Sequence, residues 1–141
     1  MADNTVSPSD AAIAAAASAL RAQQSRMRII AENMANADSV SKTAGGDPYR
    51  RQVAVFAPVQ LPSGAQGVAM TRVAADQSAF RTEYQPGHPA ADAKGYVKLP
   101  NVDPLMEAMD MRDAQRAYEA NLNVIETANA MQSSLIGLLQ K

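Results

Sequence analysis

Residues 105–141 read LMEAMDMRDAQRAYEANLNVIETANAMQSSLIGLLQK, a run that contains no proline and only one glycine, Gly137. Residues 9–44 contain neither residue type. Six of the eight prolines and the other six glycines lie between residues 45 and 100. Because glycine and proline interrupt helices, this distribution predicts two long helices, one at each end of the chain, joined by a turn-rich middle segment.

The first helix is expected over about residues 10–37, with Ser9 or Asp10 as its N-cap. Apolar residues recur along it at intervals of seven, and Ile30 lies on the same side as this series, which consists of Ile13, Leu20, Met27 and Met34. Such a repeat forms a narrow apolar seam on one face of a helix.

The second helix is expected to follow Asp103 as N-cap, with Pro104 at the first helical position, where a missing N–H costs nothing. Its apolar residues fall on three adjacent seven-residue series. The first holds Met111, Tyr118, Ile125 and Leu139, the second Leu122 and Ile136, and the third Ala114, Ala128 and Leu135. This stripe is wider than a two-stranded seam, which predicts more than one neighbour for the helix.

The two helical arms differ in charge. Residues 10–36 carry a net charge of +1 and residues 103–141 a net charge of −3, which favours pairing of unlike arms. The predicted fold is mainly α with a small β element, in which the long N- and C-terminal helices pack as an antiparallel coiled-coil-like pair and the middle is a β-rich insertion. In domain terms, residues 1–44 form the N-terminal arm, 45–100 a β-hairpin-rich segment and 101–141 the C-terminal arm. The arms together make one discontinuous helical domain.

The middle segment is expected to contain short strands. Alternating or β-prone residues predict strands at 49–57, 68–73, 80–84 and 96–99, with turns at 58–64 and 86–89. Five of the six aromatic residues lie in this segment. We therefore expect a small antiparallel element with its own aromatic cluster.

Composition argues against catalysis. The chain has no cysteine and a single histidine, His88, which reads as a surface turn residue. The net charge is −1, and no cluster of lysines and arginines stands out along the sequence. We therefore expect no nucleic-acid partner. No cofactor, metal or small-molecule substrate is expected. The alanine-rich run 11–20 is too short to span a bilayer and lacks a basic flank, so no cleaved secretory signal is predicted.

Two questions stay open from the residues alone. The apolar stripes fit either a closed helical hairpin or helices that the middle segment or other subunits must cover. Asn33 and Asn36, near the end of the first helix, can cap that helix, hydrogen-bond a neighbouring chain, or do both.

Two segments resemble a known family. Residues 31–39, AENMANADS, resemble the asparagine-containing signature near the N-terminus of flagellar basal-body rod proteins. Residues 84–103, YQPGHPAADAKGYVKLPNVD, resemble a segment typical of a proximal-rod member, and RAYEAN at 116–121 continues the similarity. The likeness runs from about Ile13 to Leu139.

This resemblance implies a structural subunit of the proximal rod that polymerises helically through its terminal helices and transmits motor torque to the hook. It implies as partners the proximal-rod proteins B and F, the distal-rod protein G, the rod-base protein E and the surrounding membrane ring. It also implies export by the flagellar type III apparatus without a cleaved signal peptide. The expected location is the flagellar basal body, spanning the periplasm. The expected assembly interface comprises Ile13, Leu20, Met27, Ile30, Asn33, Met34, Asn36, Met111, Tyr118, Leu122, Ile125, Leu135, Ile136 and Leu139. The alternative is a helical-hairpin adaptor or chaperone that binds one partner helix.

Overall fold

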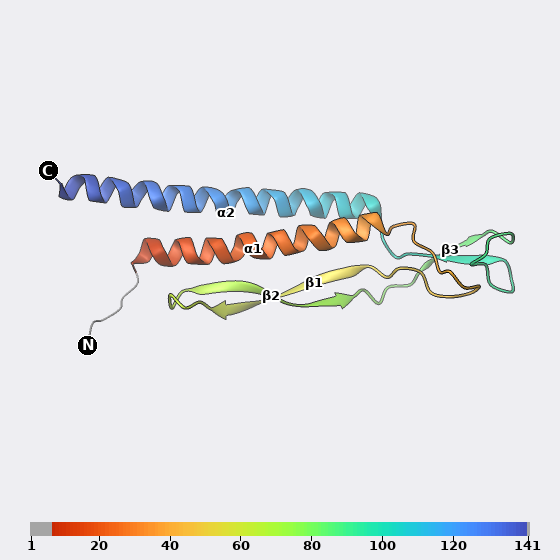
Figure 1. The fold of residues 1–141 in the computed structure, drawn as a ribbon. Helices are drawn as coiled ribbons and strands as arrows, with labels where there is room; N and C mark the ends of the chain where they lie inside the picture. The colour runs from red at the N-terminus through yellow and green to blue at the C-terminus, as the bar shows by residue number, and fades with distance from the viewer. Residues whose placement is uncertain (1–6, 141) are drawn as a thin grey trace. The chain divides into compact units, whose positions relative to one another are not determined.

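A computed structural model describes residues 7–140 and contains two long helices and four strands (Figure 1). Their order is α1 (Pro8–Ala35), β1 (Gln52–Gln60), β2 (Gln66–Ala75), β3 (Arg81–Tyr84), β4 (Tyr96–Leu99) and α2 (Pro104–Leu139). The prediction of a mainly helical chain with a small β element in its middle is therefore confirmed. Within residues 7–140, neither helix is long and apolar enough to cross a membrane.

The helices begin at polar caps. Asp103 Oδ1 accepts a hydrogen bond of 2.9 Å from the backbone N of Leu105, so the predicted N-cap of α2 is confirmed. The predicted cap of α1 is wrong, because Ser7 Oγ accepts a bond of 3.1 Å from the backbone N of Asp10 and donates one of 2.8 Å to its carboxylate. Pro8 fits the first helical position, which lets the helix begin before Ser9.

The strands form two separate two-stranded sheets, one of β1 with β2 and one of β3 with β4. The first sheet turns at residues 61–65, where Gly64 adopts a φ of 77°. Pro58, which we expected in the turn, lies within β1. A two-stranded sheet has only edge strands, and an edge strand tolerates a proline whose missing N–H would point outwards. In the second sheet Tyr84 lies opposite Tyr96.

The aromatic residues do not gather in one cluster. The rings of Tyr84 and Tyr96 meet edge to face, with centroids 5.2 Å apart. Phe80 instead lies under the guanidinium of Arg50, 4.0 Å from its ring centroid, and the Tyr49 hydroxyl donates to Asn33. The prediction failed because the sequence gives no sign that two of these rings take polar or cationic partners.

The chain forms two compact units, each built from separate segments. Among the described residues, the first comprises residues 7–25, Val55–Arg72 and residues 113–140. The second comprises Arg26–Ala54 and Val73–Arg112. Both helices and the β1–β2 hairpin contribute residues to both units.

In the first unit, α1 lies between α2 and the β1–β2 hairpin (Figure 1). On one side, Gln132 Nε2 donates to Ser9 Oγ at 3.0 Å and to Asp10 Oδ1 at 2.8 Å. On the other side, Ser18 Oγ accepts a bond of 3.1 Å from the backbone N of Val68. Cover for α1 therefore comes from α2 and from the middle segment. Small buried residues at the core of this unit allow close approach, namely Ala16, Ala22, Ala114 and Ala128.

The second unit has a core of apolar residues from the end of α1, the loops and β4. Its buried members are Ile29, Ile30, Ala37, Ala90, Val97 and Val102. Two polar side chains are buried with them, those of Asn33 in α1 and Glu107 in α2. Buried polar groups require partners, so this unit has to supply hydrogen bonds at its centre.

Candidate functional site

Glu107 is the largest fully buried side chain of the described chain, with none of its side-chain surface exposed. Its Oε1 accepts a hydrogen bond from Nε of Arg51, which makes an ion pair between a buried carboxylate and an arginine whose side chain is 24% exposed. Its Oε2 accepts a bond of 3.2 Å from Nδ2 of Asn33. The carboxylate thereby joins α2 to α1 and to the segment that enters β1.

The Asn33 amide uses both of its ends. Its Oδ1 accepts bonds from the backbone N of Gln52 at 2.8 Å and from the Tyr49 hydroxyl at 2.9 Å. Its Nδ2 donates to the carbonyl O of Gln52 at 2.8 Å, in addition to Glu107. The side chain therefore pairs with the start of β1 in the way a neighbouring strand would, and only an amide offers this donor and acceptor pair.

Arg51 is the centre of a wider charged group. Its guanidinium lies 3.5 Å from Asp76 Oδ2 and 3.3 Å from Asp110 Oδ2. Its backbone N donates to Asn101 Oδ1 at 2.8 Å. Asp110 also faces Arg26 of α1 at 3.6 Å. We refer to Asn33, Tyr49, Arg51, Asp76, Asp110 and Glu107 together as the buried junction. Asn33 and Glu107 are buried at its centre, and half-buried residues surround them.

The environment shifts the pKa values of Arg51 and Tyr49 in the buried junction. Burial alone would lower the pKa of Arg51, but the hydrogen bond and charge of Glu107, together with the charges of Asp76 and Asp110, outweigh it and raise that pKa above its ordinary value. Burial raises the pKa of Tyr49 above its usual 10.0, and the charges of Glu32 and Glu107 add to this effect. Arginine stays charged and tyrosine neutral, so neither group is prepared to exchange protons near neutral pH.

The buried junction has the chemistry of a structural tie. All the hydrogen-bonding atoms of Asn33 and both oxygens of Glu107 are engaged within the chain. Hydrogen bonds to charged groups contribute about 1.5–3 kcal/mol each, and Glu107 accepts two of them, from Arg51 and from Asn33. Among residues 7–140, no group of three or more His, Asp or Glu side chains is placed to hold a metal ion.

The residues predicted as an assembly interface differ widely in exposure. Ile30 and Asn33 are buried, and Asn33 spends its polar atoms within its own chain. Ile13, Leu20, Met27, Asn36, Met111, Tyr118 and Ile125 are half-buried. The exposed members are Met34, Leu122, Leu135, Ile136 and Leu139. Asn36 caps α1, since its Nδ2 donates to the carbonyl O of Glu32 at 2.9 Å and its Oδ1 accepts from Ser39.

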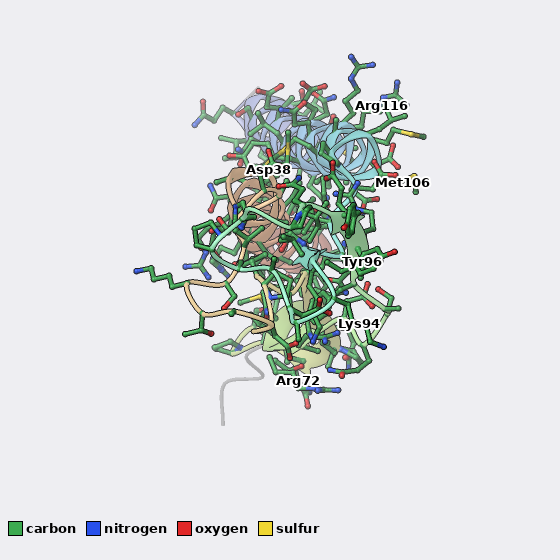
Figure 2. The ribbon with its side chains drawn as sticks, turned by 90° about the vertical axis from the view of Figure 1, so that its right-hand side faces the viewer. Asp38, Arg72, Lys94, Tyr96, Met106 and Arg116 are labelled. Atoms are coloured by element: carbon green, nitrogen blue, oxygen red, sulfur yellow. The ribbon has the colours of Figure 1, made fainter. Side chains whose placement is uncertain are left out.

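One exposed apolar series on α2 was not among the residues predicted as an interface. Val124, Met131 and Leu138 recur at intervals of seven, and they are 45%, 60% and 72% exposed. The same helix exposes Leu105, Met106 and Met109 in the second unit. Figure 2 shows Met106 on the outer side of α2. Apolar side chains that gather on an exposed surface mark binding surfaces.

An apolar groove of about 440 Å³ lies beside this series in the first unit. The first turn of α1 forms one wall and the second half of α2 forms the other. Its lining residues are Pro8, Ser9, Ala12, Asn123, Val124, Thr127, Ala128 and Met131. None of them carries a charge, so the groove suits an apolar occupant.

Sequence reasoning also missed the buried junction, although one signal was present. Glu107 lies seven residues before Ala114, and Ala114 and Ala128 belong to the buried row of α2. A carboxylate on a buried row requires a cationic partner. The identity of that partner, Arg51, could not be read from spacing because it lies in the loop before β1.

Comparison with known proteins supplies a family context for these features. The family model described as flagellar basal body rod FlgEFG protein C-terminal matches residues 93–138. This region covers β4 and nearly all of α2, including Glu107 and the exposed series.

Whole-length relatives are also found. A protein of Agrobacterium fabrum named flagellar basal-body rod protein FlgC is 45% identical, covering 94% of this chain and 96% of the relative. Proteins with the same name from Escherichia coli O6:H1 and Borreliella burgdorferi are 43% and 40% identical. Each comparison covers 89% of this chain and 93% of the relative.

Proposed function

The chain belongs to the FlgC family of flagellar basal-body rod proteins and is a structural subunit of the rod, and from this premise we propose that it polymerises helically through its terminal helices. In this arrangement the polymer forms part of the proximal rod and transmits motor torque to the hook. Family membership favours this role over the adaptor or chaperone that the residues alone left open.

The exposed apolar face of α2 is the observation that carries this proposal. Leu122 and Ile136, which are 40% and 56% exposed, lie on one side of α2, and Leu135, which is 59% exposed, lies on another side of the same helix. Burying apolar area contributes roughly 25 cal/mol per Å², so neighbouring subunits that cover this face gain a substantial driving force.

The buried junction supports the mechanical part of the proposal. It ties α1, the start of β1 and α2 together through charged hydrogen bonds within the second unit. Charge-assisted bonds are about twice as strong as neutral ones. A shaft subunit that carries torque needs ties of this kind, which resist sliding of one helix past another.

The proposed neighbours are further copies of this chain, the rod proteins B, F, G and E, and the surrounding membrane ring. We further propose export by the flagellar type III apparatus without a cleaved signal and a final position across the periplasm. These partners suit a subunit whose α2 leaves apolar side chains open to neighbours.

The test replaces exposed apolar residues of α2 in a strain that lacks its own copy of the gene. Leu122→Asp and Ile136→Asp each place a charge on the open face, so we expect loss of swimming and of the protein from purified basal bodies. Ala130→Asp places the same charge on an exposed alanine of the polar side and is the matched control. Circular dichroism of the purified variants checks that the helices persist. Normal swimming of both apolar-site variants would overturn the proposed role of this face.

A further inference from the structure

The end of α2 extends beyond the helix that it packs against. Gln132 is bonded to Ser9 and Asp10 in the first turn of α1, and the helices run antiparallel in this unit. Residues 133–139 therefore run past the first residue of α1 by about 10 Å, at 1.5 Å per residue. All of them are exposed, and the four apolar ones are Leu135, Ile136, Leu138 and Leu139. We call residues 133–139 the overhang.

The groove and the overhang complement each other, yet they cannot meet within one molecule. The groove is built on residues 123–131 of α2, and the overhang continues the same unbroken helix. A continuous helix cannot fold back onto its own preceding turns. Neither surface carries a charged residue, so an overhang could enter a groove without desolvating an ion.

We propose that the groove receives the overhang of a second copy of this chain. This inference rests on the proposed role of the chain as a polymerising subunit and names the contact that one copy makes with the next. Val124 and Met131, which are 45% and 60% exposed at the groove, are covered by the incoming helix. Ala12 and Ala128 keep the floor of the groove shallow enough for that helix to approach.

The contact uses two different surfaces and is therefore heterologous. Each copy offers one groove and one overhang, so every copy that binds leaves a free groove or a free overhang for another. Heterologous contacts generate closed rings or open helical filaments according to the rotation between copies. A rod requires this kind of contact, whereas a symmetric exchange of overhangs would stop at a dimer.

Cysteine cross-linking tests the contact directly, because the chain contains no cysteine of its own. Ala12→Cys is placed in the groove of one tagged copy and Leu138→Cys in the overhang of an untagged copy. The two are treated with a short bismaleimide after mixing, and again in basal bodies from cells that make both. We expect a covalent pair of the two copies, with twice the single-chain mass of 14.9 kDa. Arg116→Cys, whose side chain projects outwards from α2 (Figure 2), is the matched control and should give no pair with Ala12→Cys.

Three results would overturn the inference. The groove cysteine could link no better to Leu138→Cys than to Arg116→Cys, or it could link in basal bodies to a rod protein of a different mass. An Asn4→Cys, Thr127→Cys double variant could also link within one molecule, which would make the chain's own first residues the occupant. As a second measurement, Thr127→Trp fills the groove and should abolish the pair, whereas Arg116→Trp should not.

Failure of the contact and failure of the proposed function give different results. If the cysteine variants swim and are recovered in basal bodies without cross-links, only the groove assignment is wrong. If the unaltered chain itself is absent from basal bodies, the role as a polymerising subunit fails.

Discussion

Asn33 and Glu107 are 74 residues apart in the chain, and a hydrogen bond of 3.2 Å joins Nδ2 of Asn33 to Oε2 of Glu107. Glu107 is fully buried and also accepts from Arg51. We expect Glu107→Ala to lower the free energy of unfolding by about 1.5–3 kcal/mol, because it removes charge-assisted hydrogen bonds from Arg51 and Asn33. Urea unfolding of the purified subunit measures this loss.

The control for that prediction is Glu119→Ala, which removes an exposed carboxylate from the same helix. A surface substitution of this kind changes stability by about 0.5 kcal/mol or less. Equal losses in the two variants would show that the buried junction does not stabilise the subunit.

Tyr49 makes stability fall at high pH. Its pKa is raised in the folded chain above the usual 10.0, so folding favours the neutral phenol. The contribution is complete below pH 10.0 and is lost as the pH rises through the folded-state pKa, since the unfolded chain releases its proton first. Tyr49→Phe should remove this part of the alkaline transition. It should also cost about 1 kcal/mol at neutral pH through loss of the bond to Asn33.

The measurement is the unfolding midpoint between pH 8 and about 11, where unperturbed tyrosines ionise, for the parent chain and for Tyr49→Phe. Tyr118→Phe is the matched control, because it removes the hydroxyl of another half-buried tyrosine, one that lies in α2 and is not a member of the buried junction. An identical pH dependence for parent and Tyr49→Phe would contradict the prediction.

Met27→Asp and Ile125→Asp should each block assembly, because they place a charge in the predicted apolar seam of a terminal helix. Both residues are half-buried, so part of the effect will be on the subunit itself. Burying an unpaired carboxylate is costly, and we expect lower melting temperatures as well as loss of swimming. Arg28→Asp, at an exposed position of α1, separates the effect of charge from that of location. Full motility of Met27→Asp and Ile125→Asp would refute the expected role of the seam.

Amide exchange of the isolated subunit should be uneven between the helices. The overhang, residues 133–139, is exposed throughout, so its amides should be among the fastest of the helical amides to exchange. Amides near Ile29 and Ile30 of α1, whose side chains are 3% and 4% exposed, should be protected. Mass spectrometry of exchanged peptides resolves the two regions. Strong protection of 133–139 in a verified monomer would contradict this expectation.

The helices were predictable because their signals are local. The absence of glycine and proline located both, and Asp103 with Pro104 marked the start of α2. The start of α1 was missed because Ser9 and Asp10 are themselves acceptable caps, and only the structure shows that Ser7 takes this role. Local signals are ambiguous where several cap-forming residues lie in a row.

The buried junction depends on contacts between distant segments, and no local pattern specifies those. Arg51 lies in the loop before β1, and nothing in its neighbourhood separates it from Arg50. The two arginines have different partners, since Arg50 covers Phe80 and Arg51 binds Glu107. That choice follows from the direction in which the chain enters β1.

The buried junction also has a consequence for how the chain is made. Ribosomes synthesise Asn33 and Arg51 well before Glu107, and closing so long a loop has an entropic cost that grows with its length. A chain that stops before residue 107 contains Asn33 and Arg51 but lacks the Glu107 carboxylate that accepts their hydrogen bonds. Such a fragment cannot complete the fold of its second unit. Proteases can therefore degrade it before it competes with full-length chains for assembly.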